Sequence, residues 1–219
     1  MTIYTHYSDS HREMYDSFFK ESLRNIYSKD EVLIKGIYHK QTTHTGAFMS
    51  QGWLDAMDIK LDVILGAIED NKDSVFIFAD CDIQFFKPFT HLVEKELEDC
   101  DIVCQEDRGS MCAGFFGCRS NNKTKELFEN IKLNFRHMVN DQVALNHYKD
   151  SISYKLLDRD LFYTTGNHFN NPNGTYIWDN TTNIIPPQNI VLHHANYVVG
   201  VDNKLKLMEM IRSNESMAR

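Results

Sequence analysis

A short apolar run that ends in two aspartates constrains the fold more than any other feature. The run is Val75–Ala79, and Asp80 and Asp82 follow it with Cys81 between them. Side chains two apart on an extended chain point the same way, so both carboxylates can converge on one cation. Uninterrupted apolar strands are typical of parallel sheets, whose ligands bind beyond the carboxyl ends of the strands. The run predicts a buried strand that ends at a site, or else a capped strand before the turn at Pro88.

The composition is that of a globular protein with a full core. The chain has 219 residues, 42% hydrophobic and 12% aromatic, so we expect one domain over residues 1–219. The formal net charge of -8 argues against nucleic acid as a partner. No apolar stretch is long enough to span a bilayer, and the first ten residues lack the apolar core of a signal peptide. These features predict a cytoplasmic protein.

Strand-like and helix-period segments alternate along the chain, which predicts an α/β architecture. Two segments rich in polar residues and glycine, Gln41–Gly52 and Thr164–Pro187, are expected to be loops, and the second is a candidate for shaping a substrate site. The expected strands are Thr2–Tyr7, Val32–Tyr38, Val75–Asp80, Ile102–Cys104, Cys112–Cys118 and Ile190–Leu192. The expected helices are Met14–Ile26, Trp53–Ile68, the segment from Pro88 to about Glu98, Leu127–Met138 and a last helix from about Asn203.

Lys60 lies on the apolar stripe of its predicted helix, seven residues after Trp53 and four before Ile64. A lysine that faces inward needs a partner. It can extend along the helix to water, or it can reach an anion at the strand ends.

Two adjacent histidines, His193 and His194, come directly after the predicted strand Ile190–Leu192. Because neighbouring side chains on a strand point to opposite faces, at most one of them can join the aspartates, and either can instead be structural. A mixed carboxylate and imidazole shell suits Mn²⁺ better than Ca²⁺. Lys204 stands near the start of the last predicted helix, where backbone amides also attract anions.

Asp141 and Gln142 open a predicted helix, where an acidic residue is often a capping device. The alternative function for this pair is hydrogen bonding to sugar hydroxyls. Gly114 interrupts a predicted strand, which permits the close approach of a ligand or simply tight packing.

These motifs, in this order, resemble those of glycosyltransferases of the GT-A fold, in the nucleotide-diphospho-sugar transferase family, and of small virus-encoded members. The resemblance covers nearly the whole chain and implies a Rossmann-like single domain with a central, mostly parallel sheet flanked by helices. The motifs that carry it are Asp80-Cys81-Asp82, Gly114-Phe115-Phe116-Gly117, Asp141-Gln142, His194-Ala195-Asn196, Gly200 and Lys204.

The resemblance also implies roles for individual residues. Asp82 would be the main metal ligand, His194 a late metal ligand, and Asp80 a contact to the metal or the ribose; the metal would be Mn²⁺, or Mg²⁺. Lys204 would hold the diphosphate of a UDP-sugar donor, whose sugar would pass to a glycan or other hydroxyl acceptor. Further donor contacts would come from Thr5, His6 and Tyr7 around the base, from Lys60, from Gly114, Asp141 and Gln142 around the sugar, and from Asn196 and Gly200.

Stereochemistry and enzyme class leave alternatives open. If transfer inverts the anomeric centre, a carboxylate must accept the proton of the acceptor, and Asp141 is the first candidate and Asp107 the second. A retaining transfer needs no base at that place. The rival interpretations are a sugar-nucleotide-binding module without turnover, and a haloacid-dehalogenase-like phosphatase with Asp80 as nucleophile.

Overall fold

The computed structural model describes residues 1–41, 43, 50–167 and 177–217. Its main sheet has six strands: β1 (Thr2–Tyr7), β2 (Leu33–Tyr38), β3 (Val75–Ala79), β5 (Ile102–Asp107), β6 (Ser110–Arg119) and β7 (Tyr154–Leu156). The order is β2-β1-β3-β6-β5-β7, and β6 alone among these six runs antiparallel to its neighbours. The predicted α/β class with a mostly parallel central sheet is therefore confirmed.

The strand that ends at the aspartates lies in the middle of this sheet. Phe76 and Phe78 pack into the core on one face of the sheet, and Ile77 and Ala79 pack into the core on the other; all four are fully buried. A strand with helices on both faces has no solvent side, which is why every residue of Val75–Ala79 is apolar.

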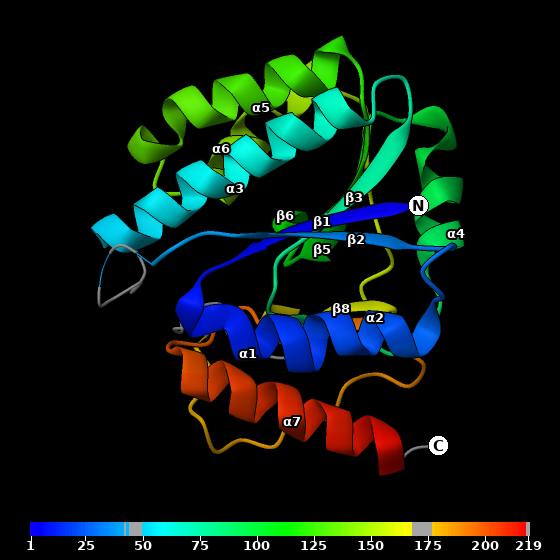
Figure 1. The fold of residues 1–219 in the computed structure, drawn as a ribbon, viewed down its shortest axis with the longest axis vertical. Helices are drawn as coiled ribbons and strands as arrows, with labels where there is room; N and C mark the ends of the chain where they lie inside the picture. Colours follow the sequence, from blue (N-terminus) through cyan, green and yellow to red (C-terminus); the bar gives the residue numbers. More distant parts are fainter. Residues whose placement is uncertain (42, 44–49, 168–176, 218–219) are drawn as a thin grey trace.

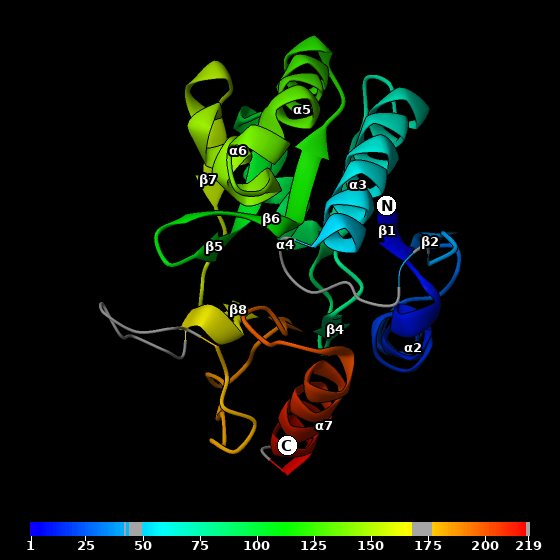
Figure 2. The same cartoon turned by 90° about the vertical axis from the view of Figure 1, so that its left-hand side faces the viewer.

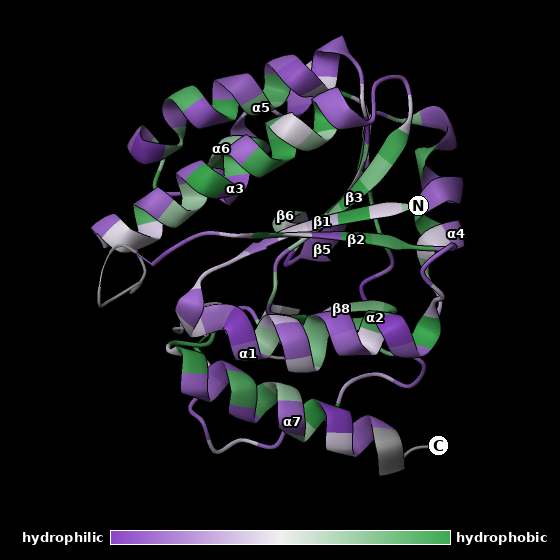
Figure 3. Cartoon of the chain, viewed as in Figure 1, coloured by the Kyte–Doolittle hydropathy of each residue, from purple (hydrophilic) through white to green (hydrophobic). Residues whose placement is uncertain are grey.

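Helices cover both faces of the main sheet (Figure 1). One layer consists of α3 (Gln51–Asp70), α5 (Asn122–Asn134) and α6 (Asp141–His147). The other face carries a continuous helical run made of α1 (Arg12–Met14), the π-helical segment η2 (Tyr15–Lys20) and α2 (Glu21–Ile26). α4 (Thr90–Glu96) packs on this same face, with Val93 close to Gly117 of β6. Figure 3 shows hydrophobic and hydrophilic residues mixed around these helices, as expected where one face meets a core. The short 3₁₀ segments are η1 (Asp9–His11), η3 (Leu97–Asp99), η4 (Phe135–His137), η5 (Lys149–Ser151) and η6 (Thr165–Asn167).

A second, three-stranded sheet lies below the main one, with the last helix, α7 (Val201–Met217), beyond it (Figure 2). Its strands are β4 (Ile83–Phe85), β9 (Leu192–His194) and β8 (Phe162–Thr164), in that order. β4 begins directly after Asp82 and pairs antiparallel with β9, which places Ile83 opposite His194. This pairing brings two distant parts of the chain to the same site.

The structure corrects several predicted boundaries. The strand predicted at Ile190–Leu192 is Leu192–His194, because both histidines pair with β4 and β8. The strand predicted at Ile102–Cys104 continues to Asp107, because it pairs with β6 as far as the hairpin turn. Strands β4, β7 and β8 have three residues each, too few for a periodic pattern, and were not predicted.

Parts of the two predicted loops, residues 42, 44–49 and 168–176, lie outside the described residues. Within the described part of the chain, no helix combines the length and the apolar character needed to span a membrane.

Candidate metal centre

Asp80, Asp82 and His194 converge where the two sheets meet. One ligand atom from each lies within 4.8 Å of the others. Asp82 and His194 are buried, and Asp80 is partly exposed. Two carboxylates and an imidazole are a donor set that divalent transition metals accept, so the residues present fit a divalent ion.

Gly114 on β6 makes room for this cluster. The backbone N–H of Asp80 donates to the carbonyl of Gly114 at 2.7 Å, which holds the end of β3 against β6. A Cβ on Gly114 would lie 2.3 Å from Cε1 of His194 and 2.8 Å from Oδ2 of Asp80. Any larger residue would push these two side chains away, so the glycine is required by the site itself.

Asp82 is held by two positive partners. Nζ of Lys204 donates to Oδ2, and Nε2 of His194 lies 3.4 Å from Oδ1. Burial alone would raise the pKa of Asp82, but Lys204 and His194 outweigh it and hold that pKa well below its usual range. Burial likewise opposes the charge on His194, yet Asp82 and Cys112 raise its pKa to about 10. The predicted conjunction of Asp82, His194 and Lys204 is therefore present in the structure.

Lys60 faces inward, as predicted, and its partners are carboxylates. Its side chain is 3% exposed, and Nζ lies 3.1 Å from Oδ1 of Asp80 and 2.9 Å from Oδ2 of Asp141. Burial works against the charge of Lys60, but the two carboxylates raise its pKa above the usual value. Burial raises the pKa of Asp80, and Asp82 adds to this while Lys60 opposes it. Each aspartate of the motif thus has its own lysine.

Asp141 and Gln142 open α6, as predicted, after the N-cap Asn140, whose side chain accepts from Val143. Asp141 points to Lys60. Nε2 of Gln142 donates to Oδ2 of Asp107 at 2.9 Å. The pair that was expected to face a sugar is therefore anchored on both sides by charged side chains.

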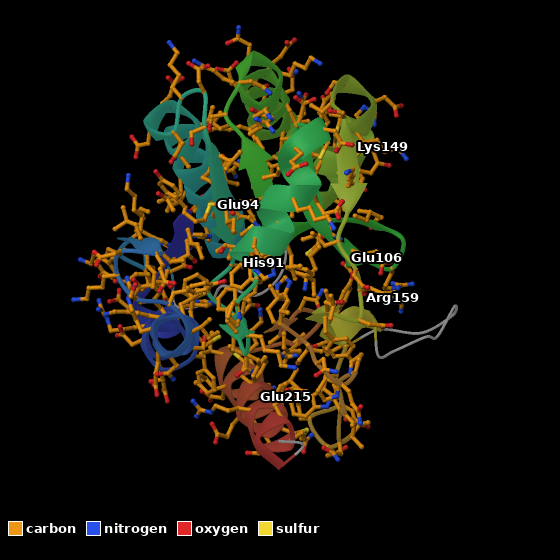
Figure 4. All side chains as sticks on the ribbon, turned by 90° about the vertical axis from the view of Figure 1, so that its right-hand side faces the viewer. His91, Glu94, Glu106, Lys149, Arg159 and Glu215 are labelled. Atoms are coloured by element: carbon orange, nitrogen blue, oxygen red, sulfur yellow. The ribbon has the colours of Figure 1, made fainter. Side chains whose placement is uncertain are left out.

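Asp107, the second candidate base, lies at the end of β5 and is 2% exposed. Its Oδ2 accepts from Gln142 and from the hydroxyl of Tyr197 at 3.0 Å, whereas Oδ1 is buried without a hydrogen-bond partner among the described residues. The preceding residue, Glu106, forms an ion pair with Arg159 at 3.5 Å (Figure 4). The alternation of a strand sends these two acidic residues to different surroundings.

The residues predicted around the base lie at the end of β1. β1 and β3 are parallel neighbours, so their carboxyl ends share one edge of the sheet. Thr5 is fully buried, and its hydroxyl has no hydrogen-bond partner among the described residues. His6 lies against His39, with 3.4 Å between ring nitrogens, and Tyr7 stacks on Tyr15 with 4.0 Å between ring centres. Burial and the charge of Lys60 lower the pKa of His6 to about 3.

Asn196 and Gly200 lie between β9 and α7. Oδ1 of Asn196 accepts from the backbone N–H of Gly166 at 3.0 Å, which ties this segment to the end of β8. Gly200 has φ of 90°, a conformation that favours glycine, and its carbonyl accepts from the N–H of Lys204. Gly200 therefore starts the turn that presents Lys204.

Gln105 and Tyr197 contact the site but were missed by the sequence prediction. Oε1 of Gln105 lies 3.0 Å from Nδ1 of His194, and Gln105 follows the last residue of the predicted strand, Cys104. Tyr197, which binds Asp107, has a φ of 56°, a conformation uncommon for non-glycine residues. A strand prediction extended to Asp107 would have pointed to Gln105; no local pattern signals Tyr197.

The comparison with known sequences finds a family and one curated relative. Residues 15–208 match the family described as nucleotide-diphospho-sugar transferase. The chain is 27% identical over 168 residues to the UDP-galactose:fucoside alpha-3-galactosyltransferase of Dictyostelium discoideum. That match covers 62% of this chain and spans about a quarter (25%) of the relative.

The comparison with solved structures identifies the fold. A glycosyltransferase involved in glycosylation of the major capsid of PBCV-1 matches with a TM-score of 0.61 at 13% identity, over 96% of this chain and 98% of the other. GlyE of Streptococcus pneumoniae TIGR4 gives 0.57 at 15% identity, covering 99% of this chain and 63% of the other. The galactosyltransferase LgtC, solved with donor and acceptor sugar analogues, gives 0.51 at 10% identity, over 96% of each chain. The expected GT-A fold is confirmed by these neighbours.

Proposed function

The chain belongs to the nucleotide-diphospho-sugar transferase family, and on this basis we propose that it is a metal-dependent glycosyltransferase. It would move a sugar from a UDP-sugar to a hydroxyl of a glycan or other small acceptor, and residues 1–219 would act as one domain. The observation that carries this proposal is the meeting of Asp80, Asp82 and His194, with Lys204 on Asp82. Family membership does not support the phosphatase alternative.

Asp80, Asp82 and His194 would hold the metal, and the mixed donor set favours Mn²⁺, with Mg²⁺ as the alternative. A bound divalent ion acts as a Lewis acid and stabilises the negative charge that grows on the leaving diphosphate. Gly114 supports this arrangement because it leaves space for the two side chains nearest to it.

Lys204 would supply the second positive charge for the diphosphate. It stands in the first turn of α7, and its side chain is 23% exposed, so a ligand can reach it. Glycosyl transfer passes through an oxocarbenium-like state, and a positive group placed where the leaving charge develops lowers the barrier. This local charge lets a protein with a net charge of -8 bind a polyanionic donor.

Asp141 and Gln142 would line the sugar pocket beside Gly114. If the transfer inverts the anomeric centre, Asp141 is the first candidate base and Asp107, with its unpartnered Oδ1, the second. Nuclear magnetic resonance of the product anomer separates inversion from retention. Thr5, His6 and Tyr7 would surround the base at the end of β1, and Lys60, Asn196 and Gly200 would support the donor from their places around the site.

The name of the Dictyostelium relative specifies UDP-galactose as donor and a fucoside as acceptor. We therefore propose UDP-galactose as the first donor to test and a fucoside as the first acceptor.

Calorimetry of UDP binding with and without Mn²⁺ tests the metal-dependent donor site. We expect clear binding only with Mn²⁺, and equal affinity in both conditions would contradict the proposal. Transfer is then measured with the donor and a panel of hydroxyl acceptors. Donor binding without transfer or slow hydrolysis would identify the chain as a sugar-nucleotide-binding module instead.

A further inference from the structure

Gln105 connects the two sheets directly behind the candidate metal centre. It lies on β5 of the main sheet, is fully buried, and its side chain reaches the smaller sheet. Nε2 donates to the backbone carbonyls of Phe162 and Tyr163, both at 3.1 Å, and Oε1 faces Nδ1 of His194 at 3.0 Å. All the polar atoms of this amide therefore have partners within the protein.

These contacts fix the orientation of the amide. The carbonyl oxygens of Phe162 and Tyr163 only accept, so the group facing them must be the NH₂ of Gln105. The opposite orientation would place the amide oxygen against two carbonyl oxygens, and each of these carbonyls would lose a buried hydrogen bond. The atom facing His194 is consequently an oxygen, which can only accept.

An acceptor at Nδ1 determines where a neutral His194 carries its proton. We propose that Gln105 is a positioning residue: its Oε1 keeps the proton of His194 on Nδ1 and leaves Nε2, the nitrogen nearer Asp82, to bind the metal. This inference rests on the proposed metal-dependent function and adds to it the residue that orients one ligand.

A second atom near Nδ1 does not change this assignment. Sγ of Cys112 lies 3.7 Å from Nδ1 and accepts from the N–H of Gly114 at 3.4 Å. A thiol is a weak hydrogen-bonding group, and the oxygen of Gln105 is closer.

The adjacent histidine provides a matched comparison. His193 is fully buried and has its own buried glutamine, Gln84, whose Nε2 donates to the carbonyl of Met208 at 2.9 Å and lies 3.4 Å from Nδ1 of His193. Nε2 of His193 lies 3.0 Å from the hydroxyl of Thr165. His193 therefore faces the protein interior, and its glutamine supports packing without contact to the metal centre.

The test is Mn²⁺ titration, with free Mn²⁺ measured by electron paramagnetic resonance. Gln105→Leu removes the acceptor, and we expect Mn²⁺ affinity to fall about 10- to 100-fold, the usual cost of losing such a supporting contact. Gln105→Glu keeps an oxygen for the Nδ1 proton, so we expect its Mn²⁺ affinity to be close to that of the parent and well above that of Gln105→Leu. Both variants lose the donations to Phe162 and Tyr163, so both should unfold at a lower urea concentration.

Gln84→Leu is the control for a buried glutamine lost from the same region. It should unfold at a lower urea concentration and bind Mn²⁺ as the parent does. Parent-like Mn²⁺ affinity in Gln105→Leu, or equal losses in Gln105→Leu and Gln105→Glu, would overturn the role of Gln105.

A measurement on the parent protein covers the case in which Gln105→Leu does not fold. With ¹⁵N-labelled histidine and Cd²⁺ as a diamagnetic substitute for Mn²⁺, Nδ1 of His194 should keep its proton while Nε2 shows metal coordination. His194→Asn assigns the signals. A proton on Nε2 and a bare Nδ1 would overturn the inference. If the parent binds neither Mn²⁺ nor Cd²⁺, the metal-dependent function itself fails, which is a different result.

Discussion

Asp80 and Asp82, which are separated by one residue, are each paired with a lysine, but the two pairs are built differently. Lys60 comes from α3 on one side of the main sheet, and Lys204 comes from α7 on the far side of the small one (Figure 1). The side chain of Lys60 is 3% exposed and binds two carboxylates, Asp80 and Asp141. The side chain of Lys204 is 23% exposed and binds Asp82.

The difference in burial separates a structural role from a ligand-binding role. A buried lysine between two carboxylates cannot leave without exposing uncompensated charge to a region of low dielectric. A lysine whose side chain is partly exposed can be reached by a ligand from solvent. Lys60 therefore fixes Asp80 and Asp141 in place, whereas Lys204 is the lysine that we propose for the diphosphate of the donor.

The largest effect is expected at Asp82, which belongs to the exchangeable pair. Asp82→Asn removes a charged metal ligand, so sugar transfer should fall about 10³-fold, equivalent to several kcal/mol of lost charge stabilisation. Initial rates of transfer from UDP-galactose measure this. Asp70→Asn, which changes an exposed partner of Lys35, is the control and should transfer as the parent does. A small loss in Asp82→Asn would mean that this aspartate is not a metal ligand.

Lys60→Met tests the buried pair through stability. It leaves the buried carboxylate of Asp141 and the partly exposed carboxylate of Asp80 without their partner, and the free energy of unfolding should fall by about 3 to 5 kcal/mol. Urea denaturation measures this. Lys35→Met removes the same residue type from an exposed pair with Asp70, where the expected loss is at most about 1 kcal/mol. Equal losses in the two variants would remove the distinction between buried and exposed pairs.

Lys204→Met should instead change donor binding. Loss of one charged hydrogen bond to the diphosphate predicts UDP affinity about 10- to 100-fold weaker in the presence of Mn²⁺. Calorimetry should also show that affinity for Mn²⁺ alone does not fall, because Lys204 is a competing cation on Asp82. If Lys204→Met loses as much stability as Lys60→Met and binds UDP normally, Lys204 has a structural role and does not bind the donor.

The smallest effect is a pH dependence at His6, which lies near Lys60. The pKa of His6 is lowered from 6.5 to about 3, first by burial and then by Lys60. Below pH 6.5 the unfolded chain therefore takes up a proton that the folded protein does not. Stability is lost as pH falls, by at most about 1.4 kcal/mol per pH unit. His6→Gln should reduce this slope between pH 6.5 and 5.5, as measured by urea denaturation at several pH values, while His193, whose pKa is also lowered to about 3, keeps its own share. An unchanged slope would show that His6 is accessible to protons.

Much of the site could be predicted because its signals are local. The end of β3, the inward position of Lys60 and the start of α6 each follow from a few consecutive residues. The rule that adjacent strand residues face opposite ways predicted that one histidine at most would join the aspartates. In the described structure, His194 does so and His193 binds Thr165.

Other features could not be predicted because they depend on pairing between distant segments. The second partner of Lys60, Asp141, lies on a different helix. Gln105 meets His194 only because β5 lies against the small sheet, and Tyr197 meets Asp107 across the same junction. Hydrophobic periodicity tells which side of an element is buried, but it does not tell which other element covers that side.

The sequence by itself determined the α/β alternation, the apolar strand that ends at Asp80 and Asp82, and the residue types able to hold a divalent ion. The tertiary structure decided which lysine each aspartate receives, and that Gln105 stands behind His194. The physical reason is the range over which each kind of interaction acts along the chain. Backbone alternation and apolar patterning act over a few residues, whereas burial and charge pairing arise only when sheets and helices pack together.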